Sequence, residues 1–397
     1  MDRKKTKSLK SALVKIAAGL TAVLVSPPLA AFVGDNSGVI ASLWEEELSA
    51  HEERELGNIV TLEMSSSVLL LYKPTEGGVE IIPQKIPSFN FDMDFLIPDK
   101  HINITSEPEA AQVLSLNITE VREEPLDFTV VDGRIVKLNY APNVGFINLG
   151  LAGQVRNETN LDRDYVFAES QKLPDIRLEL NGEPEILIMH THTTEAFQPC
   201  GFDFFDSSYY GRSLDSDKNI VAVGAEMAKS FAEAGITVIH DGTLHDYPVF
   251  NGAYARSQQT VKQILEAYPS IKIVLDVHRD AIETGDGSRV APVTQVDGRD
   301  AAQVMIISAA DDGNWDMPYF LHNFRLASLF QQYMEYDYPG ITRAVLFQYS
   351  QYNQHLTPGS LLIEVGTHGN TLEEAKYTGQ LIGRSMAEAL LSLTVDS

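Results

Sequence analysis

The sequence predicts an α/β protein built on a twisted, mostly parallel sheet with helices on both faces. Two observations lead to this prediction. From about residue 180 onward, short apolar runs alternate with longer segments that have the period of an α-helix. The apolar runs contain few polar residues, which is typical of strands that are covered on both faces. A basic and apolar N-terminal segment and a small mixed region precede this domain.

The elements of the domain can be predicted in chain order. Apolar runs predict strands at residues 186–189, 236–239, 271–277, 303–308, 344–349 and 361–365. Segments with a helical period predict helices at residues 219–234, 255–267, 321–336 and 371–393. Thr371 and Glu374 are spaced as a capping box at the start of the last helix. In sheets of this kind, functional sites lie just beyond the C-terminal ends of the strands.

The start of the chain predicts a membrane anchor. Residues 1–15 contain six Lys or Arg and one Asp, and residues 16–33 contain no charged side chain. An apolar run of this length is near the minimum that crosses a bilayer, and basic residues stay on the cytoplasmic side. We therefore expect a single-pass protein of the cell membrane whose C-terminal domain is extracytoplasmic. A signal peptide that is cleaved near Ala30 and Ala31 is the alternative.

Composition divides the chain and excludes some functions. We expect a basic start and transmembrane signal anchor at 1–33, a stalk and extracytoplasmic region of unknown role at 34–178, and a catalytic domain at 179–397. The formal net charge is -25 although the start is basic, so the body should repel nucleic-acid phosphates. Cys200 is the only cysteine, which excludes an intrachain disulfide and a thiolate zinc site.

Side chains that bind metals gather at the predicted strand ends. The first strand runs into the sequence HTHTTE, which contains His190 and His192. The third strand ends at His278, the last one contains Glu364, and Asp217 comes just before the first helix. A catalytic zinc takes three nitrogen or oxygen ligands and a water, and a nearby carboxylate serves as the general base. These residues could supply that set.

Each of these residues also has a structural interpretation. A His-x-His pair, or a single His at the end of a strand, is often only hydrogen-bonded, and Asp217 can cap the helix that follows it. Glu364 differs, because a carboxylate that follows three apolar strand residues is costly to bury without a partner. Their common position at strand ends of one sheet favours a functional site.

The same residues carry a resemblance to a known family. Residues 180–395 resemble stage II sporulation protein P of endospore-forming bacteria. The resemblance is carried by the segments ILIMHTHTTEAF, LDSDKNIVAVG, HDYPVFNGAYARS, IKIVLDVHRDAI and YNQHLTPGSLLIEVGTHGNTLEEA. It implies a fold similar to that of the zinc N-acetylmuramoyl-L-alanine amidases, and a role in peptidoglycan degradation while the forespore is engulfed.

The resemblance implies a role for each candidate residue. His192 is similar in position to the first zinc ligand of the amidases, with His190 as a rival, and His278 is similar to the last ligand. Asp217 stands where the amidases have Glu, which is a departure, since Asp is shorter by one methylene. Glu364, in a Glu-x-Gly pattern, is similar to their catalytic Glu.

Three more residues are candidates, each with an alternative. Arg279 is expected to stabilise the oxyanion that develops in the reaction, and an ion pair with Asp276 or Asp280 is the alternative. Tyr254 and Arg256 are expected to contact the substrate, and structural roles at the surface are the alternative.

The resemblance implies a zinc-dependent enzyme that cleaves the amide bond between N-acetylmuramic acid and L-Ala, with endopeptidase activity on cross-links. It implies peptidoglycan as substrate and stage II sporulation proteins D and M as partners. One rival is a zinc peptidase that cuts only the cross-links and uses the same site. The other is a non-catalytic scaffold that binds the cell wall, which would not need a set of metal ligands with a base.

Overall fold

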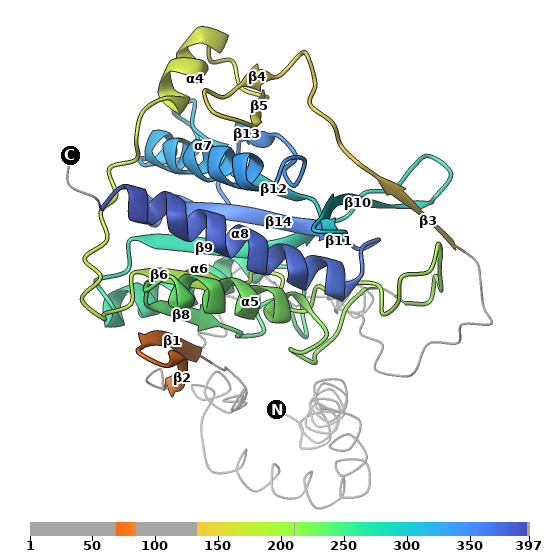
Figure 1. The fold of residues 1–397 in the computed structure, drawn as a ribbon, viewed down its shortest axis with the longest axis horizontal. Coiled ribbons are helices and arrows are strands. Elements are labelled where there is room, and N and C mark those ends of the chain that lie inside the picture. The colour runs from red at the N-terminus through yellow and green to blue at the C-terminus, as the bar shows by residue number, and fades with distance from the viewer. Residues whose placement is uncertain (1–68, 85–132, 210, 395–397) are drawn as a thin grey trace, which may run out of the picture. The chain divides into compact units, whose positions relative to one another are not determined.

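The computed structural model describes residues 69–84, 133–209 and 211–394 (Figure 1). Within them, the strands of a 10-stranded sheet are β1 (Leu69–Thr75), β2 (Gly78–Gln84), β4 (Ile147–Asn148), β5 (Gln154–Asn157), β6 (Ile186–Met189), β8 (Val238–Asp241), β9 (Ile273–Asp280), β12 (Val304–Ala310), β13 (Val345–Tyr349) and β14 (Ser360–Thr367). A 4-stranded sheet contains β3 (Gly133–Leu138), β7 (Phe204–Phe205), β10 (Arg289–Val296) and β11 (Arg299–Ala302). The helices are α4 (Arg163–Ser170), α5 (Ile220–Glu233), α6 (Ala253–Ala267), α7 (Phe320–Asp337) and α8 (Leu372–Ser392).

The large sheet is mixed, so the prediction of a mostly parallel sheet is wrong. Its strand order is β2-β1-β8-β6-β9-β14-β12-β13-β5-β4. Strands β8, β6, β9 and β14 are parallel to one another, whereas β12 is antiparallel to β14 and β1 is antiparallel to β8. A parallel neighbour needs a long crossover. Strand β12 begins two residues after the hairpin strand β11 ends, so the chain enters the sheet beside β14 without one.

The strands and helices predicted for the C-terminal half are confirmed. All six predicted strands and all four predicted helices occur, with bounds that differ from the prediction by a few residues. The predicted capping box of α8 is also present, because Thr371 and Glu374 exchange side-chain to backbone hydrogen bonds. At the start of α5, the Asn219 side chain accepts a hydrogen bond from the backbone of Val221.

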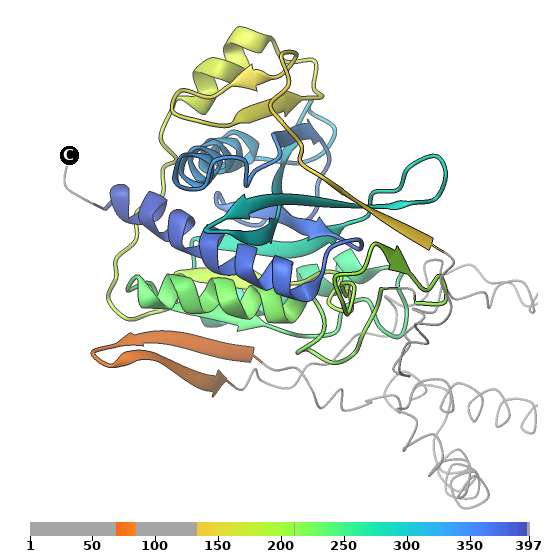
Figure 2. The ribbon, with the colours of Figure 1, turned by 45° about the vertical axis from the view of Figure 1, so that its right-hand side comes forward.

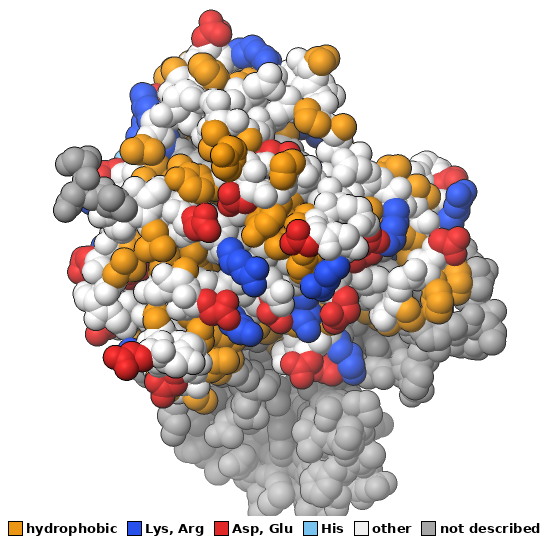
Figure 3. All heavy atoms as spheres, viewed as in Figure 1, with side chains coloured by type: hydrophobic (Ala, Val, Ile, Leu, Met, Phe, Trp, Pro, Cys, Tyr) orange, Lys and Arg blue, Asp and Glu red, His pale blue; other side chains and the backbone are white. Residues whose placement is uncertain are grey.

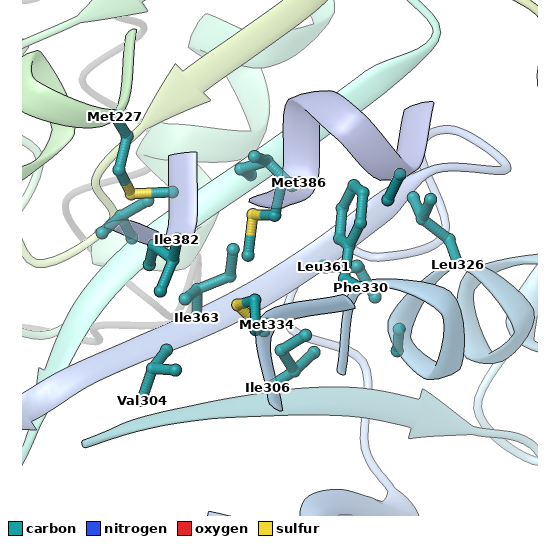
Figure 4. Close-up of a cluster of buried hydrophobic side chains, with 14 of the residues drawn as sticks. Met227, Val304, Ile306, Leu326, Phe330, Met334, Leu361, Ile363, Ile382 and Met386 are labelled. Atoms are coloured by element: carbon teal, nitrogen blue, oxygen red, sulfur yellow. The ribbon is translucent and has the colours of Figure 1, made fainter. Parts of the chain in front are cut away.

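The two faces of the large sheet are covered unequally. Helices α5, α7 and α8 pack on one face and form the main hydrophobic core with the strands (Figure 1). Figure 4 shows Met334 of α7 next to Ile306 and Ile363 from the strands, and Met227 of α5 next to Ile382 of α8. On the other face, α6 packs against β6, β8 and β9 in a smaller core.

Alternation along β9 places polar residues on the less covered face. Successive side chains of a strand point to opposite faces of the sheet. Leu275 and Val277 belong to the main core, and Val274 belongs to the smaller core beside α6. Asp276 and His278, which alternate with Leu275 and Val277, therefore lie on the same face as α6.

The region before residue 179 contributes strands to the same large sheet. The hairpin β1–β2 lies at one edge, where β1 pairs with β8 (Figure 2). Strands β4 and β5 lie at the other edge, and helix α4 contacts α7, where Glu169 and Arg325 form an ion pair of 2.6 Å. The sequence predicts no topology for this region. The predicted division of the chain at residues 178 and 179 stays a prediction.

The predicted anchor at residues 1–33 and the acidic stalk after it lie outside the described residues. None of the helices in the described ranges combines the length and the hydropathy that a membrane span requires. On the face seen in Figure 1, acidic and basic side chains are interspersed among hydrophobic ones, and neither sign of charge dominates (Figure 3).

Candidate active site

Three potential metal ligands meet where the central parallel strands end. His192 and Glu195 lie in the turn that follows β6, and His278 lies near the end of β9, the strand beside β6. Each of the three offers one ligand atom, and these atoms lie within 4.8 Å of one another. His278 and Glu195 are buried, and the side chain of His192 is 18% exposed, so the group is reached from the His192 side.

The Glu195 carboxylate lies between the two imidazole rings. Its Oε1 atom is 3.4 Å from Nδ1 of His192, and its Oε2 atom is 3.4 Å from Nδ1 of His278. The backbone N–H of Arg279 donates a hydrogen bond of 3.1 Å to Oε2. The backbone also fixes Glu195, because its N–H binds the carbonyl of His192 and its carbonyl accepts a hydrogen bond from Ile220 at the start of α5.

A second carboxylate supports His278 from the other side of the ring. Oδ1 of Asp276 lies 2.8 Å from Nε2 of His278, although the ring N–H does not point at it well enough for a hydrogen bond. Thr191 holds this carboxylate, because its N–H donates to Oδ1 and its hydroxyl donates to Oδ2, at 2.8 and 2.7 Å. Asp276 therefore contacts the Nε2 side of the His278 ring, and Nδ1 of the same ring faces Glu195.

The electrostatics of this group favour a cation. Burial alone raises the pKa of Glu195, but its contacts with His192, His278 and Arg279 outweigh burial and hold that pKa well below the usual value. Burial alone lowers the pKa of His278, but the Asp276 and Glu195 carboxylates outweigh it and hold that pKa well above the usual value. Two carboxylates thus stabilise positive charge between them.

Glu364 lies beside the group on the same face of the sheet. It is the register partner of His278 on the parallel strands β9 and β14. Its Oε2 atom is buried and has no hydrogen-bond partner among the described residues. Burial raises the pKa of Glu364 to about 8 against the opposing effect of His278. Such a carboxyl group can take up or release a proton near neutral pH.

The donor set matches what zinc takes from proteins. Two imidazole nitrogens and one carboxylate oxygen are a known set of protein ligands in catalytic zinc sites, which keep a further position for water or substrate. Asp276 behind His278 repeats the arrangement in which a carboxylate orients a histidine ligand. The residues present therefore fit a catalytic divalent metal, with His192, Glu195 and His278 as the ligands.

Comparison with known proteins places the chain in a family. The family model described as stage II sporulation protein P matches residues 152–387, which is more than half of the chain. The chain belongs to the stage II sporulation protein P family. It is 26% identical over 200 residues to Stage II sporulation protein P of Bacillus subtilis (strain 168), an alignment that covers 48% of this chain and 47% of that protein. The chain thus spans about half the length of this relative.

Solved structures of amidases also match, with low similarity. One is the N-acetylmuramoyl-L-alanine amidase AmiC2 of Nostoc punctiforme, with 13% identity, a TM-score of 0.31, and coverage of 53% of this chain and 96% of that chain. Another is the CwlD amidase from Clostridioides difficile in complex with the GerS lipoprotein, with 13% identity, a TM-score of 0.32, and coverage of 53% and 100%.

The segment ILIMHTHTTEAF contains His190 and His192, and the structure places only His192 in the ligand group. His190 lies on the opposite face of the sheet from His278. Its Nδ1 atom is 2.8 Å from the carbonyl of Val277, and its Nε2 atom is 2.9 Å from Nε2 of His240. Both rings pack against Gly224 of α5. Burial lowers the pKa of His190 to about 4, so this histidine is neutral at neutral pH and has a structural role.

Asp217, the predicted ligand in the LDSDKNIVAVG segment, is not part of the group. It is exposed in the turn before α5, where its N–H donates to Asp215. Glu195 takes the place that the prediction gave to Asp217. The signal for Glu195 was present in the family segment HTHTTE, in which a histidine and a carboxylate stand three residues apart in a short turn.

The predicted oxyanion donor Arg279 is turned away from the group. Its guanidinium donates hydrogen bonds to the carbonyls of Ala196 and Gly211, at 3.1 and 3.0 Å, and it is buried. Neither ion pair that the sequence offered as an alternative forms, since Asp276 is paired with His278 and Asp280 with Arg343. Arg279 contributes to the site through its backbone N–H on Glu195.

The two predicted substrate contacts differ in position. Tyr254 lies at the site, with its ring centroid 5.6 Å from that of His192, and Phe250 stacks on His192 at 4.6 Å. Arg256 is buried, and its guanidinium donates to backbone carbonyls, including those of His245 and Asn251. Arg256 therefore holds the loop that carries Phe250 in place.

Proposed function

We propose that this protein is a zinc-dependent peptidoglycan hydrolase that cleaves the amide bond between N-acetylmuramic acid and L-Ala, and that it acts in forespore engulfment. The observation that carries the proposal is the arrangement of His192, Glu195 and His278 beside Glu364, whose carboxylate has an unpartnered oxygen. Membership of a sporulation family supports the biological setting.

Zinc held by the three ligands would polarise the scissile carbonyl and acidify a water molecule. Glu364 is the general base of the proposed reaction, because it lies next to His278 and its pKa is about 8. It accepts the proton of the attacking water and gives it to the leaving amine of L-Ala. Asp276 holds the His278 ring in place, and the rings of Phe250 and Tyr254 border His192.

The remaining parts of the proposal concern setting and specificity. We propose that residues 1–33 anchor the protein in the cell membrane, and that the catalytic domain lies outside the cytoplasm. Stage II sporulation proteins D and M are the proposed partners. The same site would also hydrolyse peptide cross-links, since another amide carbonyl placed beside His192, Glu195 and His278 would face the same base, Glu364.

The test is a digest of purified peptidoglycan by the purified full chain, with and without a chelator, analysed by mass spectrometry. Chelator-sensitive release of stem peptides that begin with free L-Ala supports the amidase, and cleaved cross-links alone support the peptidase instead. Glu364→Gln should bind zinc and release nothing, whereas Asp217→Asn, at an exposed position outside the ligand group, should act like the wild type. If the protein binds zinc but releases no peptide, even after stage II sporulation protein D is added, the result would favour the non-catalytic scaffold that binds the cell wall.

A further inference from the structure

Arg343 is a buried cation with unused hydrogen-bond donors near Glu364. Its residue exposure is 8%, and its Nη1 atom donates to Oδ2 of Asp280 at 2.8 Å. Its Nε and Nη2 atoms are buried and have no hydrogen-bond partner among the described residues. Buried guanidinium donors without partners are unfavourable, so this arrangement indicates a group that arrives from outside the chain.

The topology shows where the Arg343 side chain runs. The backbone N–H of Arg343 binds the carbonyl of Val304, the first residue of β12. Strand β14 lies between β12 and β9, and Asp280 is at the end of β9. Thr342 bridges to Val304 on the side of β12 that faces β13, so the Arg343 side chain must pass the start of β12 and cross β14 to reach Asp280. It crosses at the level of Val365 to Thr367, which are the partners of Val304 and Asp280, just beyond Glu364.

Arg343 also lies on the same face of the sheet as the metal ligands. The preceding residue, Thr342, points to the other face, where its hydroxyl accepts a hydrogen bond from Gln331 of α7. The arginine points the opposite way, and its contact with Asp280, two residues after His278 on β9, confirms this. The ligand group, then Glu364, then Arg343 thus follow one another across this face.

We infer that Arg343 forms a subsite for a carboxylate of the peptide that leaves in the proposed reaction. The inference rests on the proposed function for the direction of the substrate. The attacked carbonyl lies at the ligand group and Glu364 protonates the leaving amine, so the leaving peptide continues past Glu364 toward Arg343. A guanidinium offers two parallel N–H donors that match the two oxygens of a carboxylate.

The ligand class is therefore a stem peptide whose free carboxylate lies shortly after the L-Ala amine. A carboxamide at that point would present its own donors to the guanidinium, and one of the two hydrogen bonds would be lost. A hydrogen bond to a charged group contributes about 1.5–3 kcal/mol. We expect the wild type to prefer the carboxylate substrate by about 10- to 100-fold in kcat/KM.

The experiment compares two soluble muramyl tripeptides that differ only in whether the α-carboxyl of the second residue is a carboxylate or a carboxamide. Arg343→Gln should lower kcat/KM far more for the carboxylate than for the carboxamide, so that the variant cleaves the two substrates with similar kcat/KM. Arg343→Lys keeps the positive charge but lacks the two parallel N–H donors of the guanidinium, so it should retain part of the preference for the carboxylate substrate. Arg384→Gln, at an exposed position on α8, is the matched control and should keep the full preference.

Two results would overturn the inference: a wild type that treats both substrates alike, or Arg343→Gln lowering both rates equally. If the wild type cleaves neither substrate, the proposed function fails, and binding of the free tripeptides by calorimetry decides about Arg343 alone. Carboxylate-dependent binding that Arg343→Gln removes would uphold the subsite, and equal binding by the wild type and Arg343→Gln would refute it. Circular dichroism melting of each variant controls for folding.

Discussion

Asp276→Asn tests whether the carboxylate behind His278 tunes the proposed metal site. The substitution keeps the shape of the side chain and one oxygen for Thr191, and it removes the negative charge 2.8 Å from Nε2 of His278. Loss of such a supporting carboxylate typically weakens metal binding by about 10- to 100-fold. That range corresponds to roughly 1.4–2.7 kcal/mol.

The structure favours the upper part of this range. Asp276 is only 5% exposed, so solvent screens its charge little, and both of its oxygens are held by Thr191, so it cannot turn away. Without the negative charge of Asp276, the His278 ring is a weaker metal ligand. Its Nδ1 atom is also no longer held facing the other ligands. The metal-free fold should also lose stability, because the negative charge beside the buried His278 ring is removed and only one oxygen remains to accept from Thr191.

The assay is competition for zinc between the protein and a chromophoric chelator, with thermal unfolding of the metal-free protein in parallel. Asp280→Asn removes a charge from the same strand without touching the ligand group, and should change zinc affinity by less than about threefold. In a His278→Ala background, Asp276→Asn should have almost no further effect. Unchanged zinc affinity in the single variant, or a full second loss in that background, would refute the reasoning.

Two further predictions separate the observed arrangement from the one expected from sequence. Glu195→Gln should abolish tight zinc binding, whereas Asp217→Asn should leave it unchanged, and the reverse result in a zinc titration would restore the sequence-based ligand set. Gly224→Ala should destabilise the fold by about 1 kcal/mol, because the new Cβ would lie 2.7 Å from the His190 and His240 rings and overpacking outweighs the better helix propensity. Equal or higher stability in thermal unfolding would contradict that packing.

The positions of three candidate residues at the ends of predicted strands could be recognised in the sequence. His192 and His278 follow apolar runs, and Glu364 lies near the end of another. These runs are the adjacent parallel strands β6, β9 and β14. Parallel neighbours end at the same edge of a sheet, so residues 86 or more positions apart in the chain meet there. The apolar pattern predicted the strand ends, and the structure shows that these strands are neighbours.

Turn geometry could not be predicted in the same way. Glu195 reaches His192 because the chain turns back directly after β6, a conformation that depends on contacts with residues 211 and 220. The resemblance favours Asp217 because it stands before the first helix, where the amidases have Glu, and a position before a helix does not determine which way a side chain points. The choice between His190 and His192 depended on the residue at which the strand ends, which is the least certain feature of any apolar run.

The antiparallel direction of β12, which the sequence did not predict, determines where Arg343 lies. Because β12 is antiparallel to β14, the start of β12 lies beside the end of β14, and Met305 pairs with Glu364. The segment that bridges to the start of β12 therefore brings Arg343 to the same edge as the ligand group. If β12 were parallel to β14, its start would lie at the opposite edge, about 20 Å away for a strand of 7 residues. The antiparallel strand thus adds a cationic neighbour to Glu364 that a wholly parallel sheet would not place there.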